Sequence, residues 1–146
     1  MKFSRVRIAA ALSAPLTVAT LFVAAPQAAA ATGTSCDVSA GTGCLTLYYN
    51  SNRSGSYTYF YGSNVSDFAS YKFLGTGAGK GLSVKNNAAS GDNVSPNPTT
   101  IFYNSNYGGS CDTLTYYAIA SQLHNTYNNN ASFKFNYTAS SCYKFN

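Results

Sequence analysis

The side chains able to carry acid–base or nucleophilic chemistry are few in this sequence. The chain has one histidine, His124, four aspartates and no glutamate. A serine triad built on His124 would need a reactive serine, and the G-x-S-x-G turn that presents one in many hydrolases does not occur. His124 lies in the polar stretch LHNTYN, which is typical of a surface residue. We therefore expect no catalytic residues and no enzyme activity.

A glycine-rich segment, GTGAGKG at residues 75–81, invites comparison with a phosphate-binding loop. The spacing does not fit, because Gly75 is one residue too close to Gly79, and Gly81 stands where serine or threonine would bind Mg²⁺. No helical pattern follows to supply an N-terminus for a phosphate group. We interpret the segment as a flexible loop.

The first 31 residues have the organisation of a secretory signal peptide. A basic start precedes the apolar stretch from Ile8 to Ala25, and the small residues Ala28–Ala30 suit a signal peptidase. Residues 32–146 are then one secreted, extracellular domain without a membrane span, which we expect to be a monomer. Its six basic residues and four aspartates give a net charge of +2 and form no cluster, which argues against nucleic acid as a partner.

Four cysteines remain in this exported domain. An even number predicts two disulfides, although four cysteines allow three pairings. Because Cys36 and Cys44 are near neighbours in the sequence, we pair them and pair Cys111 with Cys142. A zinc site is the competing interpretation, and the absence of a C-x-x-C pair and the single histidine disfavour it.

Short segments with strand-like alternation, separated by turns, make up most of the domain. The clearest predict strands at residues 44–49, 56–61, 100–103, 111–117, 132–137 and 142–145. Weaker candidates are the strands at residues 68–73 and 82–84 and one helical turn at residues 118–125. Short strands without a long helical period predict an all-β sandwich.

The second half of the domain repeats the first. Residues 48–56 read YYNSNRSGS, and residues 102–110 read FYNSNYGGS. A second shared feature follows in each half, NNAAS at residues 86–90 and NNNAS at residues 128–132. Two features that recur in the same order indicate a duplicated structural unit. Glycine permits the positive φ that a strained hairpin needs, and an aromatic ring packed over the hairpin fixes it.

This repeat resembles the βγ-crystallin superfamily, whose hairpins carry an aromatic residue, four residues, a second aromatic residue, one residue and then glycine. The second copy fits this spacing with Phe102, Tyr107 and Gly109, whereas Arg53 occupies the second aromatic position of the first copy. The resemblance implies a disulfide-braced β-sandwich of two Greek-key motifs. The motifs are expected at about residues 44–93 and 100–146.

Calcium-binding members of the superfamily carry N/D-N/D-x-x-S/T-S, and both NNxxS segments match its first five positions. The resemblance implies six candidate calcium ligands, Asn86, Asn87, Ser90, Asn128, Asn129 and Ser132. Carboxylates supply much of the affinity of a calcium site, and only Asp92 lies nearby, so binding is expected to be weak, roughly 10⁻⁴–10⁻³ M. Plain turn chemistry of Asn and Ser is the alternative, and no cofactor is required.

The sequence also resembles a narrower group, the bacterial secreted βγ-crystallin-like metalloproteinase inhibitors. Cys36 and Cys44 match the early cysteine pair of this group, and Tyr103–Gly109 matches its hairpin. The resemblance implies a proteinase inhibitor whose partner is an extracellular metalloproteinase and whose reactive loop is rigid. Residues 74–81 and the segment around Cys111 are candidates for that loop, which the sequence does not identify. The alternatives are a calcium-binding or structural crystallin-like protein and a secreted antimicrobial or toxin-like protein.

Overall fold

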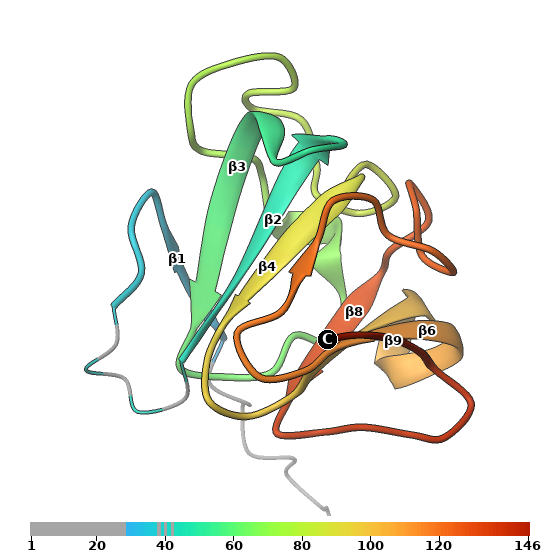
Figure 1. Cartoon of the computed structure of the whole chain (residues 1–146). Coiled ribbons are helices and arrows are strands. Elements are labelled where there is room, and N and C mark those ends of the chain that lie inside the picture. The colour runs from blue at the N-terminus through green and yellow to red at the C-terminus, as the bar shows by residue number, and fades with distance from the viewer. Residues whose placement is uncertain (1–28, 38, 40, 42) are drawn as a thin grey trace, which may run out of the picture.

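The computed structural model describes residues 29–146 except 38, 40 and 42, and the expected signal peptide lies almost wholly outside these residues. The described residues fold into a five-stranded and a four-stranded β-sheet (Figure 1). Short 3₁₀ segments, η2 (Phe68–Ser70) and η3 (Ser105–Tyr107), lie between strands. No helix in this part of the chain has the length and apolar character that a membrane crossing requires.

The strands of the two sheets come from both halves of the chain. The five-stranded sheet has the order β1-β3-β2-β4-β7. Its strands are β1 (Ala31–Gly33), β2 (Cys44–Asn50), β3 (Ser54–Tyr61), β4 (Ser90–Val94) and β7 (Ile119–Ala120). The four-stranded sheet has the order β8-β5-β6-β9. Its strands are β5 (Thr99–Asn104), β6 (Gly108–Leu114), β8 (Ser132–Phe135) and β9 (Tyr143–Phe145). Paired strands are antiparallel, except that β9 runs parallel to β6.

Each half of the domain contributes a segment to the sheet of the other half. Strand β7 belongs to the second half and pairs with β4, where Ile119 lies opposite Asp92. In return, Val65 of the first half forms an isolated bridge with Phe133 of β8. Val65 and Ile119 are separated by 54 positions, the offset that also relates the two hairpins. The predicted all-β sandwich of two related halves is confirmed, and the structure adds that the halves interlock.

The largest fully buried side chains of the core between the sheets are phenylalanines. Phe60 of β3 contacts Phe68 and Phe133, with ring-centroid distances of 5.2 and 5.3 Å, and Phe68 and Phe133 stack on each other at 5.8 Å. All three side chains have 0% exposure. Burial of each such side chain stabilises the fold by roughly 1.5–3 kcal/mol, and because Phe133 comes from the second half, this energy also holds the halves together.

Some local predictions are wrong. Residues 118–125, where a helical turn was expected, contain β7 followed by bends. The segments at 68–73 and 82–84 are not strands, because the first opens with η2 and they pair only through the bridge between Lys72 and Ser83. The strand expected at 132–137 ends at Phe135, since Asn136 has a φ of 53° that breaks the alternation.

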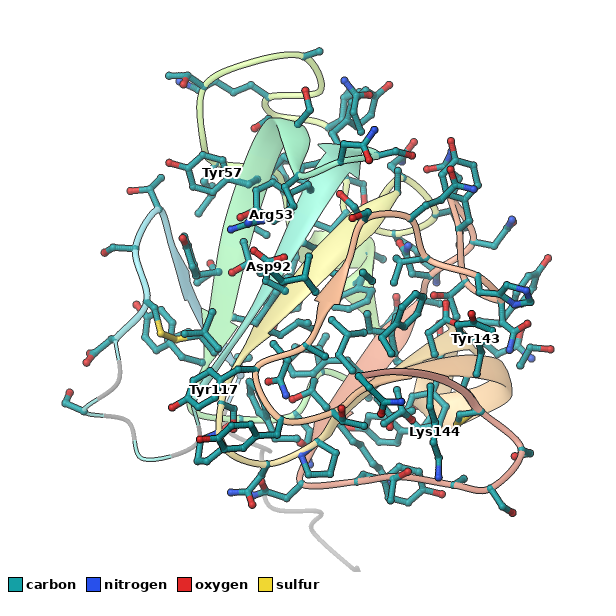
Figure 2. All side chains as sticks on the ribbon, in the orientation of Figure 1. Arg53, Tyr57, Asp92, Tyr117, Tyr143 and Lys144 are labelled. Atoms are coloured by element: carbon teal, nitrogen blue, oxygen red, sulfur yellow. A yellow bond between two sulfur atoms is a disulfide. The ribbon has the colours of Figure 1, made fainter. Side chains whose placement is uncertain are left out.

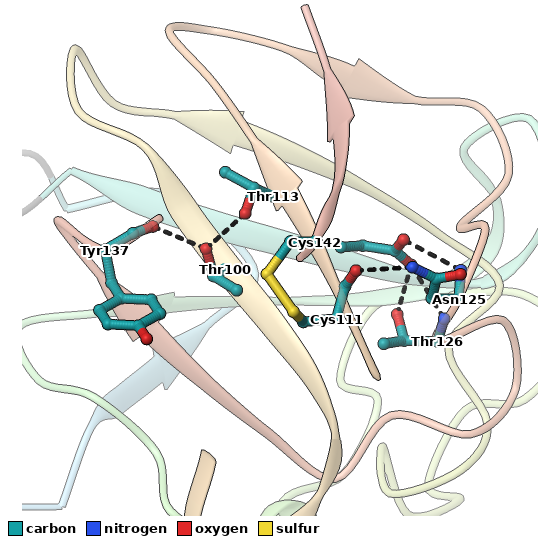
Figure 3. Close-up of a disulfide and its surroundings, with 8 residues drawn as sticks. Thr100, Cys111, Thr113, Asn125, Thr126, Tyr137 and Cys142 are labelled. Carbon is teal, nitrogen blue, oxygen red and sulfur yellow. Dashed lines mark hydrogen bonds between the residues drawn. A yellow bond between two sulfur atoms is a disulfide. The ribbon is translucent and has the colours of Figure 1, made fainter. Parts of the chain in front are cut away.

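Both predicted disulfides are confirmed. Cys36–Cys44 closes a span of 8 residues beside β2, and Cys111–Cys142 closes a span of 31 residues. The second bridge is buried against Phe102 and joins β6 to the segment before β9 (Figure 3). The described cysteines are all paired in this way, which is typical of proteins from oxidising compartments.

We predict that removing the second bridge is the more damaging change. Cys111→Ala with Cys142→Ala should lower the free energy of unfolding by about 3–4 kcal/mol, because the longer loop regains more entropy in the unfolded chain. Cys36→Ala with Cys44→Ala should lower it by about 2 kcal/mol, because the closed loop is shorter. Urea denaturation of both double variants measures the order, and a larger loss for the first bridge would contradict the prediction.

Candidate functional site

The repeated hairpins are held by the serines of the NNxxS segments. Ser90 donates its hydroxyl to the carbonyl of Asn50 at 2.6 Å and accepts the Arg53 amide at 3.1 Å. Ser132 makes the corresponding bonds, to the carbonyl of Asn104 at 2.7 Å and from the Tyr107 amide at 3.0 Å. Both serines have 0% exposure. The repeat therefore fixes two strained turns, one in each half.

Strain in these turns explains why the hairpins resemble each other so closely. Asn52 and Arg53 have φ of 58° and 57°, and Asn106 and Tyr107 have φ of 59° and 66°. Non-glycine residues rarely adopt this left-handed conformation, which costs energy that the surrounding contacts must offset. The serine bonds provide that compensation, and Arg53 occupies the same backbone position as the aromatic Tyr107.

The two NNxxS segments lie side by side and exchange backbone hydrogen bonds. The Asn86 amide donates to the Asn130 carbonyl at 2.8 Å, and the Asn128 amide donates to the Ala88 carbonyl at 3.0 Å. The buried Asn130 side chain reinforces the link, since it accepts from the Ala88 amide and donates to the Ala88 carbonyl. Sequence reasoning did not single out Asn130, although the third asparagine of NNNAS was a visible difference between the segments.

A pocket of ≈ 210 Å³ opens where the first hairpin meets both segments. Three of the predicted calcium ligands, Asn86, Asn87 and Asn128, line it. Ser90 and Ser132 bond to the hairpin backbones instead, and Asn129 does not line the pocket. The remaining lining residues are Tyr49, Asn50, Ser51, Ala89 and Tyr127. The pocket thus offers neutral oxygens, without any of the four aspartates.

The equivalent position in the other half holds a lysine ammonium group. Lys85 takes the place that Tyr127 has beside the first pocket, and its Nζ donates to Ser105 Oγ at 3.0 Å. The same Nζ lies 3.0 Å from an Asp67 carboxylate oxygen. Partial burial opposes ionisation of Asp67, but hydrogen bonds from Lys85, the Ala69 amide and Ser105 outweigh it and lower the pKa of this carboxyl. The repeat is therefore chemically asymmetric at this point.

Asp92, the carboxylate closest in sequence to the first NNxxS segment, is engaged elsewhere. Its Oδ2 lies 2.8 Å from Arg53 Nε and accepts the Tyr48 hydroxyl at 3.1 Å. Burial raises the pKa of Asp92 despite the opposing effect of Arg53. Burial and the Asp92 charge also raise the pKa of Tyr48 to about 12. The departure of Arg53 from the aromatic pattern was the sequence signal for this ion pair.

Among the described residues, no three His, Cys, Asp or Glu side chains gather closely enough to hold a metal ion. The His124 ring stacks on Tyr143 with a centroid distance of 4.1 Å, and its Nδ1 lies 2.9 Å from Asn125 Oδ1. The buried Asp112 carboxylate accepts the backbone amides of His124, Asn125 and Thr126. Asp112 therefore fixes the backbone of this loop and does not orient the histidine ring.

Comparison with known proteins identifies the fold. No family model and no curated protein matches the sequence. A domain solved for a study of the evolution of the eye lens βγ-crystallin fold has a TM-score of 0.52 and 22% identity, over 73% of this chain and 95% of that chain. A βγ-crystallin from an archaeon has a TM-score of 0.45 and 19% identity, over 64% of this chain and 96% of its own. The first likeness shows that the chain has a βγ-crystallin-like fold.

The hydrogen bonds that Ser90 and Ser132 make to the hairpins lead to a stability prediction. Ser90→Ala and Ser132→Ala should each lower the free energy of unfolding by about 2 kcal/mol, because each change removes two hydrogen bonds and leaves a backbone carbonyl and amide without a partner. The exposed Ser141 is the matched control, and Ser141→Ala should change stability by less than about 0.5 kcal/mol. Equal urea concentrations at the unfolding midpoint for all three variants would show that the bonds of Ser90 and Ser132 do not stabilise the hairpins.

Proposed function

We propose that this protein is a secreted inhibitor-like binding protein for an extracellular metalloproteinase, and that the loop of residues 74–82 enters the protease cleft. The observation that carries the proposal is that this loop is exposed and yet held in one conformation by the first hairpin. A loop that is ordered before docking loses little conformational entropy when it binds. The resemblance to secreted metalloproteinase inhibitors points to the class of partner.

Backbone hydrogen bonds anchor the start and the middle of the loop to β3. The amides of Leu74 and Gly75 donate to the carbonyl of Tyr57 at 2.9 and 2.8 Å. In the middle of the loop, the Ala78 carbonyl accepts the Ser56 amide at 2.8 Å. The segment expected to be flexible is therefore fixed to β3 by bonds that need no side chain from the loop itself.

Two tyrosine rings pack directly on loop glycines. A Cβ atom at Gly75 would lie 2.5 Å from the Tyr57 ring, and one at Gly79 would lie 2.2 Å from the Tyr49 ring. Gly79 also has a φ of 89°, which other residues rarely adopt. The glycines that resembled a phosphate loop thus permit close packing, and this packing prevents the loop from collapsing or swinging away.

The loop presents apolar side chains at its two ends. Leu74 is 38% exposed and Leu82 is 48% exposed, and the residues between them are small, apart from Lys80. In Figure 1 the yellow-green loop projects beyond the end of β3, clear of the two sheets. An exposed leucine next to a fixed segment of small residues suits a protease cleft that has a hydrophobic pocket beside the scissile bond.

Inhibition assays with one metalloproteinase of the thermolysin type and one serine protease test this proposal. We expect the metalloproteinase alone to lose activity, and Leu82→Asp to weaken inhibition by at least roughly tenfold, because a charge would enter an apolar pocket. Tyr103→Ser is the control, since Tyr103 is similarly exposed but lies on the other sheet. No inhibition by the unchanged protein at tens of micromolar, or an unchanged inhibition constant for Leu82→Asp, would refute the proposal.

We propose weak calcium binding as a second function, supported by the pocket between the first hairpin and the two NNxxS segments. Calcium prefers six to eight oxygen ligands, and carboxylates provide much of its affinity. This pocket supplies neutral side chains, whereas Lys85 brings a positive charge to the equivalent position. The asymmetry favours one site with a dissociation constant of roughly 10⁻⁴–10⁻³ M, as in extracellular modules.

Calorimetry on calcium-free protein distinguishes a site from turn chemistry. We expect one binding event per chain, and Asn128→Asp should tighten it by roughly tenfold because a carboxylate would then line the pocket. Asn129→Asp adds the same charge at a residue that does not line the pocket, and it should change the affinity much less. Absence of both heat and thermal stabilisation at about 10 mM Ca²⁺ would exclude the site.

A further inference from the structure

The outer face of the five-stranded sheet carries a row of residues that cross all five strands. Register pairs share a face of a sheet, and their side chains lie next to one another. The pairs Gly33↔Tyr59, Tyr59↔Thr46, Thr46↔Asp92 and Asp92↔Ile119 follow one another across the sheet. With strands about 4.8 Å apart, the row is roughly 19 Å long.

Tyrosines dominate one side of this face. Tyr57, Tyr59 and Tyr61 alternate with inward-facing residues of β3, and all three are half-buried. Tyr48 of β2 lies opposite Tyr57, with a ring-centroid distance of 5.9 Å, and Tyr57 and Tyr59 are 5.8 Å apart. These four tyrosines and the row that crosses them form what we call the tyrosine face.

The centre of the tyrosine face is polar. Arg53 reaches over the sheet to Asp92, and Figure 2 shows the two side chains together in front of the sheet, with Tyr57 near them. Thr46 Oγ1 and Asp92 Oδ1 are buried and have no hydrogen-bond partner among the described residues. A buried polar atom without a partner is costly, and such atoms are uncommon in folded proteins.

The charge of the face is balanced. Among the outward-facing residues of the five strands, Asp92 is the only charged one, and Arg53 from the adjoining turn pairs with it. The Arg53 side chain is 49% exposed, so its guanidinium keeps donors available to solvent. The surface therefore offers aromatic rings, hydroxyl groups and a neutralised ion pair, without net charge to attract an ionic partner.

From these features we infer that the tyrosine face binds a neutral polysaccharide chain. Tyrosine rings stack on the apolar C–H faces of sugar rings, and their hydroxyls bond to sugar hydroxyls. The exposed Arg53 donors suit a ligand rich in hydroxyl groups. The length of the row accommodates several sugar units, and the balanced charge disfavours nucleic acid and acidic polymers.

Tyrosine fluorescence titrations with two uncharged β-1,4-linked hexasaccharides, chitohexaose and cellohexaose, test the inference. We expect a saturable change in emission with one or both sugars, and the pair distinguishes acetamido-bearing chains from plain glucose chains. Tyr59→Ala should weaken binding on the order of tenfold, because one stacking ring is lost. Ile119→Lys should weaken it similarly, because it places an exposed charged side chain at the end of the row. Tyr103→Ala on the other sheet should leave binding unchanged.

Three results would overturn the inference. The first is the absence of a saturable response to either sugar at about 10 mM, above the millimolar range of weak binding. The second is unchanged affinity in the Ile119→Lys protein, which alters an exposed side chain and leaves the core intact. The third is a concentration-dependent dimer in sedimentation that Ile119→Lys abolishes, because the face would then bind a second copy of this chain.

Discussion

The structure depends on hydrogen bonds exchanged between the two halves of the domain. The amides of Asn86 and Asn128 each donate to a carbonyl of the opposite NNxxS segment, and the buried Asn130 side chain bonds to both backbone groups of Ala88. Strand β7 and Val65 then complete the sheet of the opposite half. Neither half has a finished sheet or a covered core alone, so the halves are stable only together.

This interlock determines where function can lie. The geometry that the two hairpins share engages the hydroxyls of Ser90 and Ser132, which are therefore unavailable to a ligand. What differs between the halves is therefore more informative than what repeats. Lys85 occupies the position equivalent to Tyr127, and Arg53 occupies the position equivalent to Tyr107. The two halves therefore present different charges on the same backbone. Duplication supplied the scaffold, and the first hairpin borders a polar pocket whereas Lys85 bonds to Ser105 of the second hairpin.

The first hairpin also links the proposed activities. Tyr49 packs on Gly79 of the rigid loop and lines the pocket, while Tyr48 and Tyr57 belong to the tyrosine face. The loop and the face are therefore positioned by one element whose conformation Ser90 fixes. A protein with few charges can still present distinct surfaces in this way, because strained turns and close aromatic packing hold the backbone in place.

Alternation of side chains and the repeated hairpin motif determined the fold class and the two related halves, and the spacing of the cysteines determined the disulfide pairs. These features depend on local spacing, which the sequence displays directly. The sequence also singled out Asn86, Asn87 and Asn128 as candidate ligands, but it assigned Asn129, Ser90 and Ser132 to the same role. Only the tertiary structure showed that both hydroxyls hold hairpins, that Asp92 pairs with Arg53, and that Lys85 reaches Ser105. Those contacts join residues that lie 20 to 40 positions apart in the sequence. They follow from how the two halves pack, which no local sequence pattern records.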